Sequence, residues 1–314
     1  MLEVKNVTKR YANHTALDDV SLTVEKGSVY GLLGPNGAGK TSLIRIINRI
    51  TMPDTGEIRL DGAPMTQNDV YHIGYLPEER GLYKKMKVGD QAVYFARLKG
   101  LSKAEAVRRL KYWFDRFQIR EWWDKKVEEL SKGMAQKVQF IVTVLHEPKL
   151  LIFDEPFSGF DPINANLLKE EILNLRDSGA TVIFSTHNMS SVEEVCDHIT
   201  LISRSKNILS GSVNEVRRQY GTDLYRVDFK GDSAKLASLL TAKGLSIGHE
   251  QNSPAYHSLR LAIPSGTTTR EVLSLVNDQV EVHNFMEIIP SMNDIFIKAV
   301  GESNVEPSNS TGNE

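Results

Sequence analysis

The chain alternates between short, continuously apolar runs and longer runs in which apolar residues recur every three or four positions. The short runs, which favour buried strands, include SVYGLLG, KLLIFDEP and TVIFSTH. The periodic runs favour helices, one from about Lys40 to Ile50 and one from Asp161, the expected N-cap, to just before Gly179. Buried strands that alternate with helices predict an α/β fold, with a mainly parallel sheet covered on both faces.

Two regions depart from this alternation. Residues from about 87 to 149 form an expected helical insert, in which AEAVRRLKYWFDRF places its apolar side chains on one helical face. Those side chains are Val107, Leu110, Trp113, Phe114 and Phe117. After about Gly221 the order βαββαβ resembles a ferredoxin-like domain. We therefore expect domains at 1–221 and 222–301, and a disordered polar tail at 302–314.

Composition narrows the class of protein. The chain is 40% hydrophobic and 25% charged, as soluble globular proteins are, and its net charge of -2 predicts no general attraction to nucleic acid. The single cysteine, Cys196, excludes an internal disulfide and fits a reducing compartment. The start lacks a signal-peptide core, and no segment approaches about 18 uninterrupted apolar residues. We expect a cytoplasmic protein that reaches a membrane only through a partner.

The strongest chemical signal is GLLGPNGAGKTS, which contains G-x-x-x-x-G-K-[ST] from Gly34 to Thr41 between a strand and a helix. Glycines there let successive N–H groups approach phosphate at a helix N-terminus. Lys40 supplies a charge for the β- and γ-phosphates, and the Thr41 hydroxyl is offered to Mg²⁺. The nucleotide-binding residues expected in this loop are Gly34, Asn36, Gly37, Ala38, Gly39, Lys40, Thr41 and Ser42. The alternative is a Gly-rich turn that binds nothing.

Acidic and basic side chains follow two of the buried strands. Asp154 ends LLIFD and should point to the Mg²⁺ held by Thr41, while Glu155 can act as general base on a water. His187, at the end of STH, is expected to contact the γ-phosphate and to hold Glu155. The alternative for Asp154 and Glu155 is a pair of acids in a surface turn, and the alternative for His187 is a structural role.

A second anion site is expected on the helical insert. In LSKGMAQK, Ser131 can cap the following helix and Gly133 allows close approach. Because the first loop already holds its own nucleotide, a nucleotide on another subunit would use this second site more easily.

GPNGAGKT, LSKGMAQK, LLIFDEP, SGFDP and STH occur in the order and spacing of an ABC-type ATPase, which residues 1 to 220 resemble. The resemblance implies a P-loop ATPase core with a β-rich edge subdomain and an inserted helical subdomain. It further implies ATP and Mg²⁺ as cofactors and a head-to-tail dimer with two ATP molecules between the subunits. In the family pattern Tyr11 stacks on adenine and Asp161 communicates between the two sites.

The chain departs from the family pattern at several motif positions. Lys132 and Met134 replace a glycine and a glutamine in the signature, and Phe160 replaces a leucine. Glu78, in IGYLPEERGLY, stands where glutamine is usual. We expect Glu78 to contact Mg²⁺, directly or through water, when the insert closes, since Mg²⁺ favours carboxylate oxygens. The alternative is an exposed loop acid.

PEERGLYKKM, LSKGMAQK and the C-terminal extension narrow the resemblance to ATPase components of sodium-extruding and related bacterial exporters. It implies a separate integral membrane permease, which the insert contacts and which holds this chain at the inner face of the cell membrane. Trp122 and Trp123 are candidate contacts, although packing within the insert is the favoured interpretation. The rival functions are a soluble ABC-type ATPase that acts on ribosomes or DNA and a regulatory module without hydrolysis. The chain has one ATPase cassette, no heptad repeats and no basic tail, which argues against an ATPase that acts on ribosomes or DNA. The presence of Lys40, Asp154, Glu155 and His187 together argues against a module that has lost hydrolysis.

Overall fold

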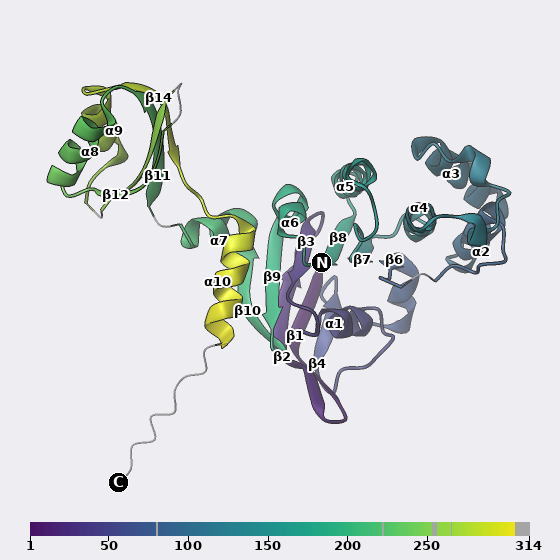
Figure 1. Ribbon diagram of the computed structural model, residues 1–314. Coiled ribbons are helices and arrows are strands. Elements are labelled where there is room, and N and C mark those ends of the chain that lie inside the picture. The colour runs from purple at the N-terminus through teal and green to yellow at the C-terminus, as the bar shows by residue number, and fades with distance from the viewer. Residues whose placement is uncertain (80, 222, 253–255, 265, 305–314) are drawn as a thin grey trace, which may run out of the picture. The chain divides into compact units, whose positions relative to one another are not determined.

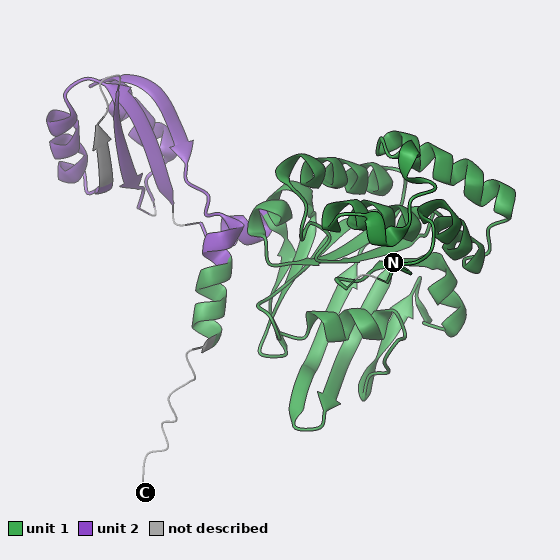
Figure 2. Ribbon diagram, turned by 45° about the vertical axis from the view of Figure 1, so that its right-hand side comes forward, with its two compact units in different colours: residues 1–213, 296–314 green, residues 214–295 purple. Residues whose placement is uncertain are grey.

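The computed structural model describes residues 1–79, 81–221, 223–252, 256–264 and 266–304. It contains two compact units, which Figure 2 shows in different colours. Unit 1 comprises Met1–Val213 and the chain from Phe296, and unit 2 comprises Asn214–Ile295. The sequence placed the border at residues 221 and 222, whereas α7, Val213–Gln219, falls almost wholly in unit 2.

A six-stranded sheet forms the centre of unit 1, in the order β10-β9-β3-β8-β7-β6 (Figure 1). Its strands are β3 (Val29–Leu33), β6 (Ile73–Leu76), β7 (Leu150–Asp154), β8 (Thr181–Thr186), β9 (His198–Ser203) and β10 (Lys206–Ser212). All neighbours are parallel except the β9–β10 hairpin. Every residue of β3, β7 and β8 is buried, as continuous apolar runs predict for strands covered on both faces.

A second, antiparallel sheet of unit 1 has the order β2-β1-β4-β5. Its strands are β1 (Leu2–Tyr11), β2 (His14–Val24), β4 (Thr55–Leu60) and β5 (Ala63–Pro64), and η1 (Gln67–His72) follows. Helix α1 (Lys40–Ile47) buries Leu43 and Ile44 in one cluster with residues of both sheets. It ends before the predicted Ile50, because Asn48 caps it and Arg49 adopts a left-handed φ of 55°.

The predicted helical insert contains α2 (Val88–Leu98), α3 (Lys103–Arg116) and α4 (Lys132–Val144), with short turns η2 (Arg120–Trp122) and η3 (Val127–Glu129). The predicted apolar face of α3 is confirmed, since Leu110 and Phe114 are fully buried. Trp122 is 9% exposed, and the Trp123 ring packs edge-on against Phe114 with centroids 5.5 Å apart. The interpretation that these two tryptophans pack within the insert therefore agrees with the structure.

Helix α5 (Pro162–Asp177) follows β7, and helix α6 (Met189–Val195) follows β8. The Asp161 side chain accepts a hydrogen bond from the N–H of Asn164 at 3.0 Å, so the predicted N-cap of α5 is confirmed. Gly179, with a φ of 98°, follows the end of α5 as expected.

Unit 2 contains an antiparallel sheet in the order β12-β13-β11-β14, with α8 and α9 packed on it. Its elements are β11 (Leu224–Lys230), α8 (Ser233–Ala242), β12 (Ser246–Asn252), β13 (His257–Ala262), α9 (Thr269–Asn277) and β14 (Glu281–Glu287). The βαββαβ order is the predicted one, and the first and third strands are central, as in a ferredoxin-like domain.

The chain continues into α10 (Met292–Asn304), which spans the division between the units at Phe296. The predicted disordered tail is therefore wrong at 302–304, which are helical, and its remainder lies outside the described residues. No helix in the described part of the chain is both long and apolar enough to cross a membrane.

The aromatic core of the insert gives a stability prediction. Phe140 is 0% exposed, and its ring lies 5.5–6.1 Å from those of Trp113, Phe117 and Phe153. Phe140→Ala should lower the free energy of unfolding by about 3–5 kcal/mol, through lost burial and the cavity that remains. Tyr112→Ala, at a side chain 62% exposed, should change it by less than about 1 kcal/mol. Urea unfolding followed by circular dichroism measures both, and equal losses would contradict the packing described.

Candidate functional site

A cleft of about 500 Å³ lies where the turn between β3 and α1 meets the carboxyl ends of β7 and β8. We call it the loop cleft. The predicted site residues that line it are Tyr11, Asn36, Gly37, Ala38, Gly39, Lys40, Thr41, Ser42, Glu78, Asp154, Glu155 and His187. Residues more than a hundred positions apart thus share one cleft, because β3, β8 and β7 are neighbours in the parallel sheet.

Glycines shape the turn at the base of the loop cleft. A Cβ on Gly34 would lie 2.2 Å from the carbonyl oxygen of Ile202, so no side chain fits there. Gly37 has a φ of +78°, and a Cβ built on it meets nothing within 4 Å. The backbone at Gly37 therefore borders open space, which suits an anion cradled by N–H groups.

Lys40 places a cation in this turn. It is 7% exposed, and its Nζ donates hydrogen bonds to the carbonyl oxygens of Gly34 at 2.7 Å and Pro35 at 3.2 Å. Burial lowers the pKa of Lys40, while the negative charges of Glu155 and Asp154 act in the opposite direction. The ammonium thus faces the carboxylates across the loop cleft.

Thr41 and Asp154 form a pair of hard oxygen donors. The Thr41 Oγ1 lies 3.4 Å from Oδ2 of Asp154, which is 3% exposed. Oδ1 of Asp154 accepts a hydrogen bond from Ser185, its partner across the β7–β8 register. Hydroxyl and carboxylate oxygens, held by a second hydrogen bond, are the ligands that Mg²⁺ prefers. The donor set therefore fits the predicted magnesium ion.

Glu155 and His187 are brought together as the sequence predicted. Nδ1 of His187 lies 2.8 Å from Oε1 of Glu155. The Glu155 backbone adopts a left-handed φ of 50°, which is rare for a residue other than glycine, and its N–H donates to the Ser185 carbonyl at 3.1 Å. The Glu155 side chain is 13% exposed and that of His187 is 67% exposed. The carboxylate is thus held at the cleft by a histidine that solvent reaches.

Three lining residues were missed by the sequence analysis: His14, Ala16 and Ser158. His14 and Ala16 belong to β2, which begins after the two-residue turn that follows Tyr11, and a hairpin signal there could have indicated them. Ser158 lies within SGFDP, the motif from which only Asp161 was taken.

Ser131, Gly133 and Asp161 do not line the loop cleft of their own chain. Ser131 caps α4, accepting a hydrogen bond from the N–H of Met134 at 3.3 Å, while Asp161 caps α5. A Cβ on Gly133 would lie 3.6 Å from the Gly159 carbonyl oxygen. Both helix starts are therefore built as predicted, at a place distinct from the loop cleft.

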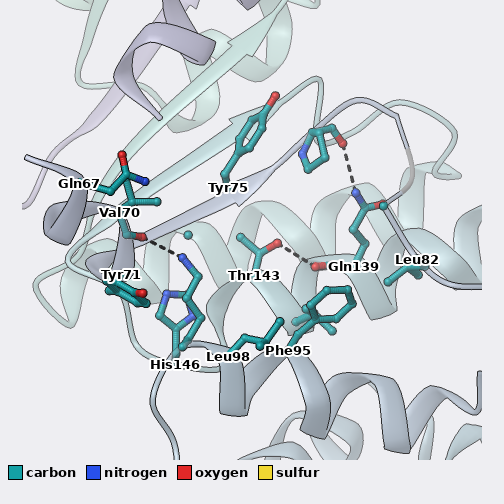
Figure 3. A pocket seen from close by; sticks show the side chains of 15 residues that line it. Gln67, Val70, Tyr71, Tyr75, Leu82, Phe95, Leu98, Gln139, Thr143 and His146 are labelled. Carbon is teal, nitrogen blue, oxygen red and sulfur yellow. Dashed lines mark hydrogen bonds between the residues drawn. The ribbon is translucent and has the colours of Figure 1, made fainter. Parts of the chain in front are cut away.

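A second cavity, of about 450 Å³, lies between the insert and the core and is named the insert groove (Figure 3). Its walls include Tyr71, Leu82, Phe95 and Leu98. Lys99 donates hydrogen bonds to the carbonyl oxygens of Val70 and Ile73, both at 2.8 Å. Burial lowers the pKa of His146 to about 4, so this side chain is neutral at pH 7. The groove is therefore mostly apolar.

Comparisons with known proteins identify both parts of the chain. A protein-family model described as ABC transporter matches residues 17–158. A second model, described as the C-terminal domain of ATP-binding protein DrrA1-3-like, matches residues 211–300. The matches thus cover the whole of unit 2 and most residues of the loop cleft, all except Tyr11, His14, Ala16 and His187.

Relatives match over most of the chain. The uncharacterized ABC transporter ATP-binding protein YhaQ of Bacillus subtilis is 41% identical over 96% of this chain and 99% of its own length. The ABC transporter ATP-binding protein NatA of the same organism is 37% identical over 64% of this chain and 83% of its own length. The resemblance stated from the motifs is therefore confirmed.

Solved structures agree on the fold. One described as the ATP-binding subunit of an ABC transporter is 32% identical, covers 70% of this chain and 93% of its own, and has a TM-score of 0.65. The ATP-binding cassette MJ0796, described as dimeric in a post-hydrolysis state with ADP and Pi, has a TM-score of 0.63. The match covers 68% of this chain and 99% of that cassette at 20% sequence identity, so it shows a shared fold. This chain belongs to the family of ABC transporter ATP-binding proteins, a family of ATPases.

Proposed function

We propose that this protein is the ATP-hydrolysing motor subunit of a two-component exporter, in which two copies enclose two MgATP and drive a separate permease. The observation that carries the proposal is the convergence of Lys40, Thr41, Asp154, Glu155 and His187 on one cleft. Together these side chains supply each group that phosphoryl transfer to water needs. Family resemblance supports the exporter class.

The loop cleft binds the nucleotide in this proposal. The N–H groups around Gly37 and the ammonium of Lys40 hold the phosphates, and Tyr11, which is 41% exposed at the rim, stacks on adenine. Thr41, Asp154 and Glu78 supply oxygen ligands for Mg²⁺, directly or through water. When bound, the metal neutralises charge on the β- and γ-phosphate oxygens.

Glu155 is the proposed general base. Its carboxylate accepts a proton from the attacking water, and Nδ1 of His187 fixes the carboxylate through the 2.8 Å contact. In this proposal the His187 ring also contacts the γ-phosphate. The register of β7 and β8 holds Glu155 in place, so most of the rate enhancement comes from positioning and charge stabilisation.

Dimerisation would complete the site. Because Ser131, Gly133 and Asp161 lie outside the cleft of their own chain, a second copy arranged head to tail can bring its capped α4 to the γ-phosphate. ATP then closes the dimer, and hydrolysis removes the contacts that hold it closed. The dimeric cassette with ADP and Pi named above supports this arrangement.

The insert groove is the proposed docking surface for a short helix of the permease, which keeps the protein at the cytoplasmic face of the membrane. Its apolar walls continue into exposed Tyr71 and Leu98, which are 57% and 55% exposed. These residues suit the partner better than Trp122 and Trp123, which pack inside the insert. The permease would select the exported substrate, such as a sodium ion or a drug.

Replacing the general base should separate binding from hydrolysis. Glu155→Gln keeps the shape of the side chain but cannot accept the proton, so kcat should fall by roughly 10²–10⁴-fold. MgATP should still bind and should trap a dimer, which gel filtration with labelled ATP detects. Near-normal turnover in this variant would remove Glu155 from its role.

Glu78 has its own test. Glu78→Gln removes a charge but keeps an oxygen, so the Mg²⁺ concentration for half-maximal ATPase should rise roughly tenfold. Steady-state rates across a Mg²⁺ titration give this value at saturating ATP. A Mg²⁺ titration curve that coincides with the wild-type curve would contradict a contact between Glu78 and the metal.

The docking surface can be tested apart from catalysis. Leu98→Glu places a charge in the insert groove, and we expect the membrane partner to be lost from co-purification while the isolated subunit keeps its ATPase rate. Tyr112→Glu, on the same insert but outside this groove, should retain the partner. Equal recovery of the permease with both variants would place its docking site elsewhere.

A further inference from the structure

Gln139 is a buried amide in the wall of the mostly apolar insert groove. It lies on α4 and is 6% exposed. Figure 3 shows its side chain next to Thr143, with its nitrogen directed at a backbone carbonyl across the groove. A buried amide among apolar side chains is unfavourable unless it makes hydrogen bonds, so its partners indicate what it does.

Those partners are two carbonyl groups on either side of Glu78. Nε2 of Gln139 lies 3.3 Å from the Pro77 oxygen and 3.4 Å from the Glu79 oxygen. A side-chain amide has two N–H hydrogens on one nitrogen, so a single Gln can serve both acceptors. A carboxylate or an aliphatic chain in its place could serve neither.

Glu78 itself faces two hollows. It lines the loop cleft, and it also lines a smaller hollow of about 260 Å³ together with Pro77, Gln139 and Lys132. Pro77 and Gln139 line the insert groove as well. The segment 77–79 is therefore the wall that the groove and the cleft share, and Gln139 contacts it from the groove side.

Few other bonds hold this segment. Strand β6 ends at Leu76, and among the residues that the structure describes no hydrogen bond to the carbonyls of Pro77 and Glu79 is found besides those from Gln139. The position of the Glu78 backbone relative to α4 thus depends on one side chain.

We propose that Gln139 is a positioning residue for the ATPase: by binding the backbone on both sides of Glu78, it holds the Glu78 carboxylate at the metal side of the loop cleft. A partner segment that enters the insert groove and shifts α4 against β6 would act on Glu78 through the same two hydrogen bonds. The inference rests on the proposed role of Glu78 and adds the residue that sets its place.

The test uses the full-length chain and Gln139→Met, which keeps the length of the side chain and removes both donors. The Mg²⁺ concentration for half-maximal ATPase should rise about tenfold, the low end of the effect of losing an outer hydrogen bond to a metal ligand, because Gln139 holds the backbone and not the carboxylate itself. Thr143→Val is the matched control, because it removes a hydroxyl one turn along α4 that bonds only within its helix. This control should leave the Mg²⁺ dependence unchanged.

A double-variant cycle distinguishes positioning from general destabilisation. If Gln139 acts through Glu78, the variant with both Gln139→Met and Glu78→Gln should show the Mg²⁺ dependence of Glu78→Gln alone. Thermal unfolding of each variant shows whether Gln139→Met is destabilised more than Thr143→Val. Should the Met variant not purify folded, Gln139→Asn, whose amide sits on a stem one methylene shorter, serves the same comparison.

The proposal is overturned if Gln139→Met titrates with Mg²⁺ as wild type does, if the two effects multiply, or if Glu78→Gln itself has no effect. The proposed function fails in a different way: the wild-type chain would show no ATPase, or Glu155→Gln would retain it. The positioning role alone would be refuted if the wild type hydrolyses ATP, Glu155→Gln does not, and Gln139→Met has the Mg²⁺ dependence of the wild type.

Discussion

The main-chain pairing of β3 with β8 and of β8 with β7 is the constraint on which the site depends. The register pairs Leu33 with Thr186 and Asp154 with Ser185, so three strand ends stop at the same edge of the sheet. The phosphate loop, the two acids and His187 each follow one of these ends. A slip of one residue in any pairing would turn its side chains to the opposite face of the sheet. The catalytic geometry is thus fixed by backbone hydrogen bonds before any side chain contributes.

The charged side chains that this strand pairing brings together do not balance, because the carboxylates outnumber the buried lysine. Lys40 is a buried cation opposite Asp154, Glu155 and Glu78, and desolvation already opposes its charged form. Three carboxylates at one cleft would repel a polyphosphate that arrived alone. A divalent cation between the acids and the phosphates removes this conflict, because it attracts both. The proposed binding of MgATP follows from this balance, because nucleotide and metal then depend on each other for entry to the cleft.

The sequence predicted those site residues that belong to a short motif at the end of a buried strand. The phosphate loop, Asp154, Glu155 and His187 could be predicted because each follows a recognisable apolar run. A hairpin signal after Tyr11 could have indicated the strand that carries His14 and Ala16, but their place in the cleft depends on where that hairpin packs. Gln139 was missed because a polar residue in a helical pattern reads as solvent-facing, whereas it is buried by the segment after β6. The domain border near residue 221 was misplaced for a similar reason. Helix α7 belongs mostly to unit 2 because of its tertiary contacts, which the local sequence pattern does not show.

Two of the departures from the family pattern, Lys132 and Glu78, are easier to understand together. Lys132 and Glu78 come from distant parts of the chain and line the same hollow of about 260 Å³, beside Glu79. The aliphatic part of Lys132 lies over Gly159, whose Cβ position is 2.8 Å from Cε and 3.3 Å from Nζ. In the proposed function a glutamate at position 78 adds negative charge next to the phosphates, and a Lys132 ammonium in the same hollow would offset part of that charge. The proposed metal contact of Glu78 is therefore easier to reconcile with nucleotide binding in a chain that has a lysine at position 132.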